Sequence, residues 1–446
     1  MIRIAFLAPA GAMHRAGGNF GKSLHYAPLT LTTLAALVPE EIETELSIHD
    51  ETVEKIDPDL EADLICITVI TGTAPRCYRY ADYFRNRGIT VALGGVHVSM
   101  LPEEAAQHAD ILFTGFSEQT FPQMIRDFAK GEAKPRYHQE EGYSLIGRPM
   151  PRRDLLKKDG YITTATLEAV RGCSYPCTFC AYPTAFGRTV YERNVDEVLR
   201  EVEALQSRIL VFPDVNLMAN RAYAKALFTA LIPYKKQWLG LVTSSIGLDD
   251  EMLDLFEKSG CRGLLIGFES ITQDAQSFIN KGVNHVKDYK ELMKKLHSRG
   301  ILVQGCFAFG SDEEDPSVFE KTVEMVEEIR IDLPRYSILT PFPKTRLYAD
   351  LEAQGRIFER DWAMYDVEHC VFTPKNMTVE QLEEGITWAW EQTYSFRSIF
   401  QRLKPFRHAP WLSLPLNFGY KGYADKYHRY TREVMTDNRD IPEVRA

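Results

Sequence analysis

The stretch Arg171-Gly172-Cys173-Ser174-Tyr175-Pro176-Cys177-Thr178-Phe179-Cys180 places three cysteines at the spacing C-x₃-C-x₂-C, directly after the apolar run Ile162 to Val170. A strand that ends in a loop would bring the three thiolates around one small object. Iron–sulfur clusters take cysteine thiolates as ligands, usually four, so three cysteines leave one iron open. A structural zinc site needs a fourth ligand, and none of the twelve residues after Cys180 is Cys or His. The spacing favours a cluster, with a zinc knuckle or a chance group of thiols as the alternatives.

This motif resembles the cluster-binding motif of radical S-adenosylmethionine (SAM) enzymes. The resemblance implies a [4Fe–4S] cluster bound by Cys173, Cys177 and Cys180, with SAM chelating the open iron through its amino and carboxylate groups. It also implies that an electron from the cluster breaks a carbon–sulfur bond of SAM and yields a 5′-deoxyadenosyl radical. Phe179, the aromatic residue before the third cysteine, matches the family too, where its neighbourhood packs on adenine.

The composition is that of a globular protein. The chain has 446 residues, enough for roughly three domains, and its 45% hydrophobic and 26% charged content is typical of soluble proteins. No apolar run approaches the roughly 18–20 residues that span a bilayer. The net charge of −10 argues against general nucleic-acid binding.

The N-terminus and the cysteines bear on the compartment. The apolar start, Ile2–Leu7, is soon interrupted by Pro9 and Gly11, so it predicts a buried strand rather than a signal peptide. Eight cysteines in a chain of this length, three of them clustered, do not form a disulfide framework. A reducing cytoplasm is the expected location, and an oxygen-sensitive cluster would require it.

Strand and helix patterns alternate over the first 140 residues or so. Apolar runs that predict strands are Ile2–Leu7, Thr44–Ile48, Asp63–Ile70, Thr90–Leu93 and Ile111–Phe113. Helical patterns lie between or after them at Thr30–Leu37, Ala74–Arg87, Pro102–His108 and Gln119–Lys130. This alternation predicts a doubly wound, Rossmann-like parallel sheet, in which ligands bind outside the carboxyl ends of the strands.

Small and polar residues occupy those strand ends. The segment from Gly94-Gly95-Val96-His97 to Glu104, together with Asp50-Glu51-Thr52 and Thr114 to Glu118, resembles the cobalamin-binding domain that precedes the radical domain in one large subgroup of radical SAM enzymes. The resemblance implies cobalamin contacts from the strand-end residues Thr68, Thr71, Gly94, Gly95, His97 and Gly115.

One departure concerns the cobalt ligand. Cobalamin mutases and methionine synthase carry a D-x-H-x-x-G motif whose His binds cobalt, and this chain has no such motif. The subgroup commonly lacks it, so His97 is expected as a loop residue near the cofactor rather than as a cobalt ligand. A degenerate domain that binds no cobalamin is the alternative.

A Pro- and Gly-containing connector follows, and the boundary is placed near residue 145. Six further strands are predicted with helices between them: Thr164–Val170, Ile209–Phe212, Trp238–Thr243, Gly263–Gly267, Leu302–Ala308 and Tyr336–Leu339. They agree with the partial (β/α)₆ barrel of radical SAM enzymes. We therefore expect three regions: a cobalamin-binding-type domain over 1–145, a radical SAM barrel over 146–345 and a helical C-terminal cap over 346–446.

Polar residues at the barrel strand ends are the expected SAM contacts, because chemistry in barrels lies at the carboxyl ends of the strands. Asp214 and Asn216 follow the second strand, Ser244 ends the third, and Glu269 ends the fourth with Asn280-Lys281-Gly282 downstream. Helix capping is the plain alternative for each of them. Cys261, Cys306 and Cys370 are expected as small buried hydrophobes.

The C-terminal tail has an unusual composition. Residues 397–432 hold eight basic residues against one acidic residue, with eight aromatics interleaved. One interpretation is a helical cap whose aromatics pack on the barrel. The other is a peripheral membrane contact or a surface for an anionic partner, because basic residues are drawn to anionic lipids and Trp and Tyr favour interfaces.

The resemblance predicts a cobalamin-dependent radical SAM methyltransferase. The 5′-deoxyadenosyl radical would take a hydrogen from an unactivated carbon, and methylcobalamin would deliver the methyl group, with a flavodoxin- or ferredoxin-type protein as external electron donor. Two alternatives stay open: a radical SAM enzyme that forms C–C bonds or rings or rearranges its substrate without methyl transfer, and a non-catalytic iron–sulfur or cobalamin-binding protein. The sequence identifies neither the substrate, small or lipid-like, nor the oligomeric state.

Overall fold

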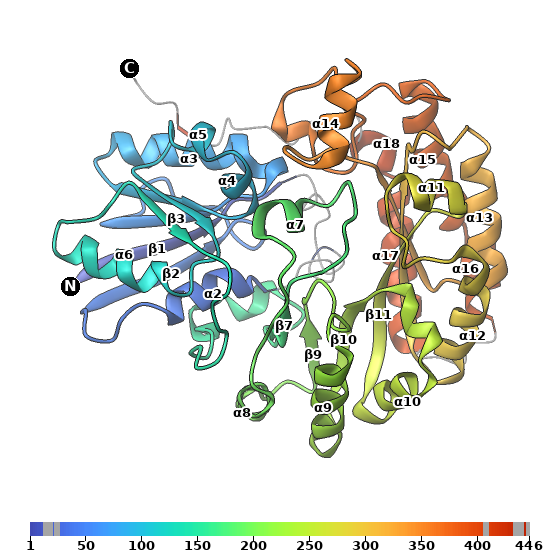
Figure 1. The fold of residues 1–446 in the computed structure, drawn as a ribbon, viewed down its shortest axis with the longest axis horizontal. Coiled ribbons are helices and arrows are strands. Elements are labelled where there is room, and N and C mark those ends of the chain that lie inside the picture. Colours follow the sequence, from blue (N-terminus) through green and yellow to red (C-terminus); the bar gives the residue numbers. More distant parts are fainter. Residues whose placement is uncertain (12–20, 22–26, 405–409, 431–440, 443–446) are drawn as a thin grey trace.

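The computed structural model describes residues 1–11, 21, 27–404, 410–430 and 441–442. Two bodies lie side by side (Figure 1): an N-terminal α/β body in blue and teal, and a barrel in green and yellow with C-terminal helices in orange and red. Among the described residues, we find no helix that is both long and apolar enough to cross a membrane.

The N-terminal body is built on a six-stranded parallel sheet, sheet A, with the order β2-β1-β3-β4-β5-β6. Its strands are β1 (Ile2–Ala8), β2 (Thr44–Asp50), β3 (Leu64–Thr68), β4 (Thr90–Gly94), β5 (Ile111–Gly115) and β6 (Arg136–Gln139). The predicted doubly wound sheet is confirmed. The edge strand β6 was not predicted, because its short alternating sequence, with Tyr137 buried between exposed neighbours, lies in the polar connector.

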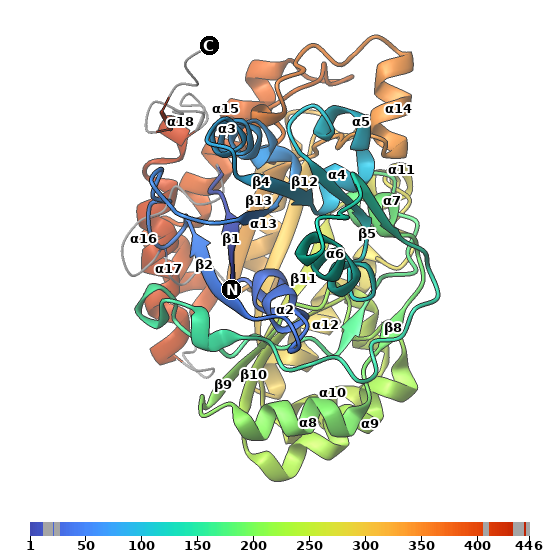
Figure 2. The same cartoon turned by 90° about the vertical axis from the view of Figure 1, so that its left-hand side faces the viewer.

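Helices cover both faces of sheet A, as Figure 2 shows. On one face, α3 (Ala74–Asn86) packs Cys77 and Phe84 against the strands. On the other lie α2 (Leu29–Ala36) and α6 (Thr120–Ala129). The cluster under α3 also takes in Ile441, which is 2% exposed, so the chain returns to its first body near its C-terminal end.

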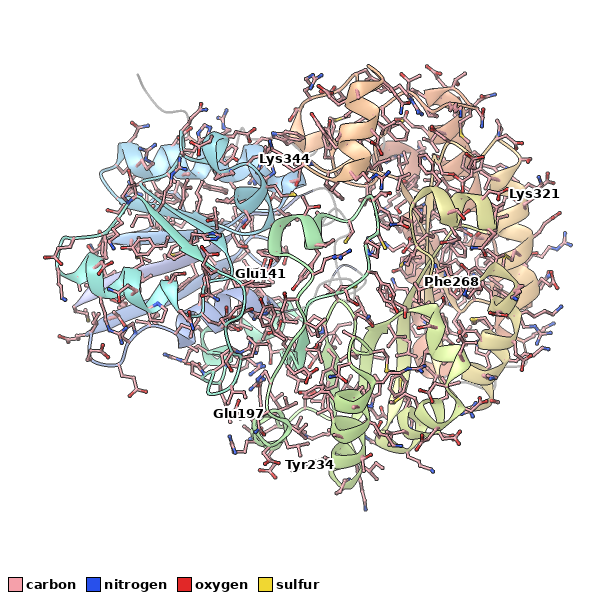
Figure 3. All side chains as sticks on the ribbon, viewed as in Figure 1. Glu141, Glu197, Tyr234, Phe268, Lys321 and Lys344 are labelled. Carbon is pink, nitrogen blue, oxygen red and sulfur yellow. The ribbon has the colours of Figure 1, made fainter. Side chains whose placement is uncertain are left out.

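The barrel sheet has five parallel strands in the order β13-β12-β11-β10-β9. They are β9 (Ile209–Phe212), β10 (Gln237–Val242), β11 (Cys261–Glu269), β12 (Leu302–Phe309) and β13 (Leu333–Ile338). Around them lie α8 (Val195–Ala204), α9 (Arg221–Leu231), α10 (Asp250–Ser259), α11 (Gln273–Phe278), α12 (Tyr289–Ser298) and α13 (Val318–Ile329). Phe268, labelled in Figure 3, is fully buried inside this body, whereas Lys321 on α13 projects from its rim.

The predicted first barrel strand, Thr164–Val170, is wrong in extent. Thr166 makes a single parallel bridge to Val211, and only the short strand β7 (Val170–Arg171) follows, paired antiparallel with β8 (Tyr191–Glu192). The Thr166 carbonyl accepts from Arg153. The Ala169 and Val170 N–H groups donate to Asp214, so they are not available to a strand ladder. The barrel is therefore a five-stranded sheet with a sixth segment attached at one bridge.

The C-terminal region is helical, as expected. It contains α14 (Arg346–Ala353), α15 (Val379–Thr393), α16 (Phe396–Leu403), α17 (Pro410–Ala424) and α18 (Tyr427–Tyr430). Much of the tail packs inward: Tyr420 and Tyr427 surround Trp390, and buried Arg402 donates to the Ile331 and Asp332 carbonyls. These side chains are not available to a membrane, and Phe406, Arg407 and Arg432 of the tail lie outside the described residues.

Candidate active site

The three motif cysteines lie on the loop between β7 and α7 (Ala181–Phe186), which we call the cluster loop. Gly172 opens it with φ +113°, and a Cβ there would lie 2.3 Å from the Thr189 carbonyl oxygen, so only glycine fits this turn. Helix α7 begins directly after Cys180. The chain thus turns at Gly172 directly after β7, and the three cysteines follow in the loop before α7 begins.

Backbone and amide contacts hold the cluster loop in place. Thr178 N donates to the Ile279 carbonyl at 3.1 Å, and Asn280 Nδ2 donates to the Pro176 carbonyl at 3.0 Å. Leu347 N donates to the Thr178 carbonyl at 3.0 Å from the start of α14. The loop is therefore clamped between the segment after α11 and the C-terminal cap.

The three thiols form a group that suits a cluster. Cys173, Cys177 and Cys180 are half-buried, and Cys177 and Cys180 lie within electrostatic reach of Cys173 and of Lys281. Burial raises the pKa of the Cys177 thiol to about 12, which the nearby Lys281 ammonium partly opposes. Among the described residues, no three His, Cys, Asp or Glu side chains converge on a single metal ion. Thiolates of a cluster bind separate irons, so three separated sulfurs are what a cluster requires.

Glu269 and Lys281 form a partly buried ion pair beside these thiols. Glu269 ends β11 with φ +62°, a left-handed conformation that is costly for a residue with a side chain and is enriched at functional sites. Its carboxylate accepts from Lys281 Nζ, which also donates to the Gly267 carbonyl at 3.0 Å. The pair places one carboxylate and one ammonium next to the cluster loop.

Three of the other residues predicted to contact SAM make contacts within the protein. Asn216 Oδ1 accepts from Met218 N at 3.1 Å, which is a turn-capping bond, and Ser244 Oγ donates to Asn284 Oδ1 at 2.6 Å. Phe179 packs half-buried against the barrel core. For these three residues a SAM contact stays a prediction.

Asp214 lies at the boundary between the two bodies. Its Oδ1 accepts from the Ala169 N–H at 2.9 Å and from the Val170 N–H, whereas Oδ2 has no hydrogen-bond partner. Burial, followed by the nearby Glu168 carboxylate, raises the pKa of Asp214 to about 8. The residue thus fixes the segment that leads into the cluster loop, and among the described residues its buried Oδ2 has no hydrogen-bond partner.

A cavity of about 440 Å³ separates the carboxyl edge of sheet A from the cluster loop. We call it the interdomain cavity. One wall is apolar, and the other carries charged groups from both bodies. Its lining residues include Leu31, Leu34, Thr68, Gly94, Gly95, Phe113, Gly115, Phe116, Glu118, Glu168, Arg171, Gly172, Tyr182, Phe186 and Asp214. Its volume lies in the range of cofactor sites.

Two glycines in the wall of the cavity have backbone conformations that other residues rarely adopt. Gly95 has φ +115°, and a Cβ would lie 2.6 Å from the Val69 carbonyl oxygen. Gly115 has φ +73°, and its Cβ would lie 2.7 Å from the Gln139 carbonyl oxygen. The wall is therefore bare backbone at these points, and a flat ligand could approach it closely.

Two residues predicted to contact cobalamin, His97 and Thr71, are not among the residues that line this cavity. His97 is fully buried, with Nδ1 3.3 Å from Thr71 Oγ1 and Nε2 3.1 Å from Glu104 Oε1. The Trp362 indole lies against the His97 ring and donates to Glu104 Oε2 at 2.9 Å. His97 and Thr71 thus connect sheet A to the C-terminal cap, and neither lines the interdomain cavity.

Comparison with known proteins identifies the barrel. The model of the radical SAM superfamily matches residues 167–326, which include the three cysteines and strands β9 to β12. Residues 167–326 form a radical SAM domain. A radical SAM domain implies a [4Fe–4S] cluster and SAM, and the clamped trio of thiols is where such a cluster would be held.

Relatives of this radical SAM enzyme cover most of its length. Bacteriochlorophyllide d C-12(1)-methyltransferase of Chlorobaculum tepidum is 29% identical over 388 residues, 84% of either chain. The solved structure of the radical SAM methyltransferase TsrM from Kitasatospora setae covers 97% of this chain and 99% of its own, with a TM-score of 0.69 at 16% identity. The cobalamin-dependent radical SAM enzyme OxsB covers 96% of this chain and 72% of its own, with a TM-score of 0.70 at 13% identity. Both bodies therefore have the fold of cobalamin-dependent radical SAM enzymes.

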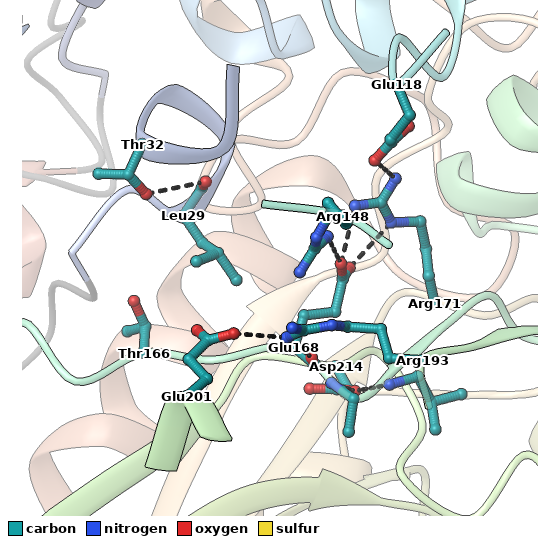
Figure 4. A network of polar contacts seen from close by, with 12 residues as sticks. Leu29, Thr32, Glu118, Arg148, Thr166, Glu168, Arg171, Arg193, Glu201 and Asp214 are labelled. Atoms are coloured by element: carbon teal, nitrogen blue, oxygen red, sulfur yellow. Dashed lines mark hydrogen bonds and ion pairs between the residues drawn. The ribbon is translucent and has the colours of Figure 1, made fainter. Parts of the chain in front are cut away.

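A network of ion pairs joins the two bodies of the radical SAM enzyme beside the interdomain cavity (Figure 4). Arg171, two residues before Cys173, pairs with Glu118 from the loop after β5 and donates to Glu168 at 2.7 and 2.9 Å. Arg148 from the connector also pairs with Glu168. Burial alone would raise the pKa of Glu168, but the two guanidinium groups lower it to about 2. The network holds the cluster loop, the connector and sheet A in one arrangement.

Sequence reasoning missed this network. Arg171 stands within the quoted motif and carried a local signal, but Glu118 and Arg148 are distant in sequence and nothing around them marks them as its partners. Lys281 was noted only as part of a matching tripeptide, and its pairing with Glu269 required the fold.

Proposed function

We propose that this radical SAM enzyme binds cobalamin in the interdomain cavity and transfers a methyl group to a carbon atom of its substrate. The observation that carries the proposal is the position of that cavity, which has the carboxyl edge of sheet A on one side and the cluster loop on the other. A corrinoid held there would lie next to the cluster and SAM. The 29% identical relative is a methyltransferase, which favours methyl transfer over the other reactions of the superfamily.

When bound, the cluster and the corrinoid supply the electron that cleaves SAM and the methyl group that is transferred. The residues of the chain position these groups. The three cysteines would hold the cluster and leave one iron to SAM, and the Lys281–Glu269 ion pair lies beside Cys177. Glycine backbone at Gly94, Gly95 and Gly115 allows close approach, and the apolar wall from α2 excludes water.

A bacteriochlorophyllide, on which the first of these relatives acts, is the substrate class that we propose to test first. We also propose a reducing cytoplasmic location and a flavodoxin- or ferredoxin-type electron donor, because the cluster must be reduced before each turnover. The tail keeps exposed Phe396, Phe400 and Phe418 beside exposed Arg397, and this surface is the part of the tail that could contact a membrane.

The test is an anaerobic assay of the reconstituted, full-length enzyme with hydroxocobalamin, a chemical reductant and SAM that carries a deuterated methyl group. We expect 5′-deoxyadenosine, S-adenosylhomocysteine and a substrate heavier by one deuterated methyl group. Release of 5′-deoxyadenosine without S-adenosylhomocysteine would favour C–C bond formation, ring formation or rearrangement instead. Release of neither compound would favour a non-catalytic binding protein.

A further inference from the structure

The inner face of the barrel sheet is accessible to solvent. Along β10 to β13, buried residues that pack against the surrounding helices alternate with half-buried residues on the opposite face. The outward set includes Phe309, whose ring packs at a tilt against Phe319 of α13, and Tyr336, whose hydroxyl hydrogen-bonds to Thr393 of α15. The inward set includes Leu241, Leu265, Gly267, Gln304, Cys306 and Arg335. We call the space that these inward residues surround the barrel lumen.

Arg335 occupies the middle layer of the barrel lumen on the edge strand β13. In the strand register Arg335 is level with Cys306, and Cys306 is level with Gly267 of β11. Adjacent strands are about 4.8 Å apart, so the Arg335 and Gly267 backbones are separated by roughly 10 Å. Cys306, expected as a buried hydrophobe, is half-buried in this layer, unlike the fully buried Cys261 and Cys370.

The Arg335 guanidinium is an unpaired charge. It makes no hydrogen bond or ion pair with any residue that the structure describes, even though the side chain is half-buried. Burial lowers the pKa of Arg335. Nearby groups outweigh this effect, so that the pKa is raised overall; they are Tyr420, Cys306, Tyr423 and Glu368. The nearby carboxylate, Glu368, lies beyond ion-pair distance and accepts a hydrogen bond from Tyr423. Partly burying a guanidinium without a counter-charge costs free energy, and binding of an anion would offset that cost.

The position of Arg335 relates it to the reacting centre. Lys281 lies within electrostatic reach of both Cys177 and Cys306, so it stands between the cluster loop and the layer of Arg335. Its own charge is neutralised by Glu269. An anionic group held by Arg335 would therefore lie across the lumen from the cluster loop, with the rest of the molecule pointing toward the carboxyl ends of the strands. The separation between Arg335 and the cluster loop leaves room for a substrate between the guanidinium and SAM.

We propose that Arg335 binds a carboxylate of the substrate in the barrel lumen and thereby sets which carbon faces SAM. The inference rests on the proposed function for its substrate class, a tetrapyrrole acid. A guanidinium binds a carboxylate through two parallel hydrogen bonds, which fixes orientation as well as affinity. Tyr420, which accepts a hydrogen bond from Gln304 at 3.1 Å, lies beside Arg335 and limits the carboxylate to this side of the lumen.

The test measures the arginine-specific reaction of phenylglyoxal with the full-length, cluster-loaded enzyme without SAM, read out by peptide mass spectrometry. We expect Arg335 to react faster than the ion-paired Arg171. Chlorophyllide a, which has a free carboxylate, should slow the reaction of Arg335 about tenfold, the effect of one charge-assisted hydrogen-bonded pair. Its methyl ester should slow that reaction less than about twofold, because an ester is a weak partner for a guanidinium.

Variants provide an independent measurement. Arg335→Gln should bind chlorophyllide a about tenfold more weakly and its methyl ester unchanged, and Arg335→Lys should recover part of the loss. Arg262→Gln removes another half-buried arginine of the barrel, near the amino end of β11, and should change neither affinity.

An unreactive Arg335 would overturn the proposal, and so would equal protection by acid and ester or protection by neither. Failure of the proposed function is seen separately, as the absence of 5′-deoxyadenosine in the assay above. The absence of 5′-deoxyadenosine would not change the result of the phenylglyoxal experiment on Arg335.

Discussion

The interdomain cavity and the barrel lumen differ in how their charges are satisfied. Beside the cavity, Arg171 and Arg148 share Glu168, and Arg171 also pairs with Glu118. In the lumen, Arg335 has no partner among the described residues. Paired charges hold protein segments in one arrangement, whereas an unpaired charge can bind an anion. The difference supports our proposal that the lumen binds an anionic group of the substrate, while the ion pairs beside the cavity hold the two bodies together.

The largest effect is expected from the loop between the two spaces. Cys177→Ala removes a predicted cluster ligand, so bound iron should fall, and the rate of 5′-deoxyadenosine formation should fall by at least about a thousandfold. The matched control is Cys261→Ala, a cysteine buried in the barrel core, which should keep full iron content. Iron and sulfide analysis with the product assay measures both. Normal iron in Cys177→Ala would show that the cluster is held by other groups.

The charged side of the cavity predicts the next largest effect. Arg171→Ala leaves Glu118 and Glu168 buried without this partner and should cost about 3 kcal/mol in the free energy of unfolding. Arg126→Ala breaks an exposed pair with Glu41 and should cost less than about 1 kcal/mol. Urea unfolding of the cofactor-free proteins compares them. Equal losses would mean that the network does not hold the two bodies together.

The backbone wall of the cavity predicts a smaller loss. Gly95→Ala forces a side chain into φ +115° and against the Val69 carbonyl, so it should cost about 2 kcal/mol and weaken hydroxocobalamin binding. Gly282→Ala is the control, because its Cβ would meet open space and its φ is not in the left-handed region. Thermal unfolding and a cobalamin titration report the two effects. Unchanged binding in a folded Gly95→Ala protein would place the corrinoid elsewhere.

The smallest effect concerns pH. Because the folded pKa of Asp214 is raised to about 8 above the ordinary value of about 3.9, the folded state binds this proton more tightly than the unfolded state. Its contribution to stability is therefore greatest at low pH and is lost as pH rises toward 8. Asp214→Asn keeps an oxygen for the two N–H donors but cannot titrate.

The measurement compares urea unfolding of the wild type and of Asp214→Asn at pH 7 and pH 8. We expect the wild type to lose about 1 kcal/mol more than the variant over this interval. Parallel pH profiles for the two proteins would show that Asp214 titrates in its usual range.

Local signals made part of this molecule predictable. The cluster loop is contiguous, and the apolar runs of sheet A are buried on both faces, so both could be predicted from sequence. The segment Thr164–Val170 is apolar, as a strand would be, but two of its N–H groups donate to Asp214 instead of to a neighbouring strand. Arg335 could not be found, because the absence of a partner is a property of the folded chain. The contact between His97 and Trp362 could not be predicted, because the two residues lie far apart in the sequence.

The burial of Ile441 under α3 has a consequence for the order of biosynthesis. Domains generally fold in the order in which the ribosome releases them, and the N-terminal sheet emerges first. Yet one member of its hydrophobic cluster is translated after every strand of both bodies. The nascent first domain therefore lacks one member of its hydrophobic cluster until residue 441 has left the ribosome.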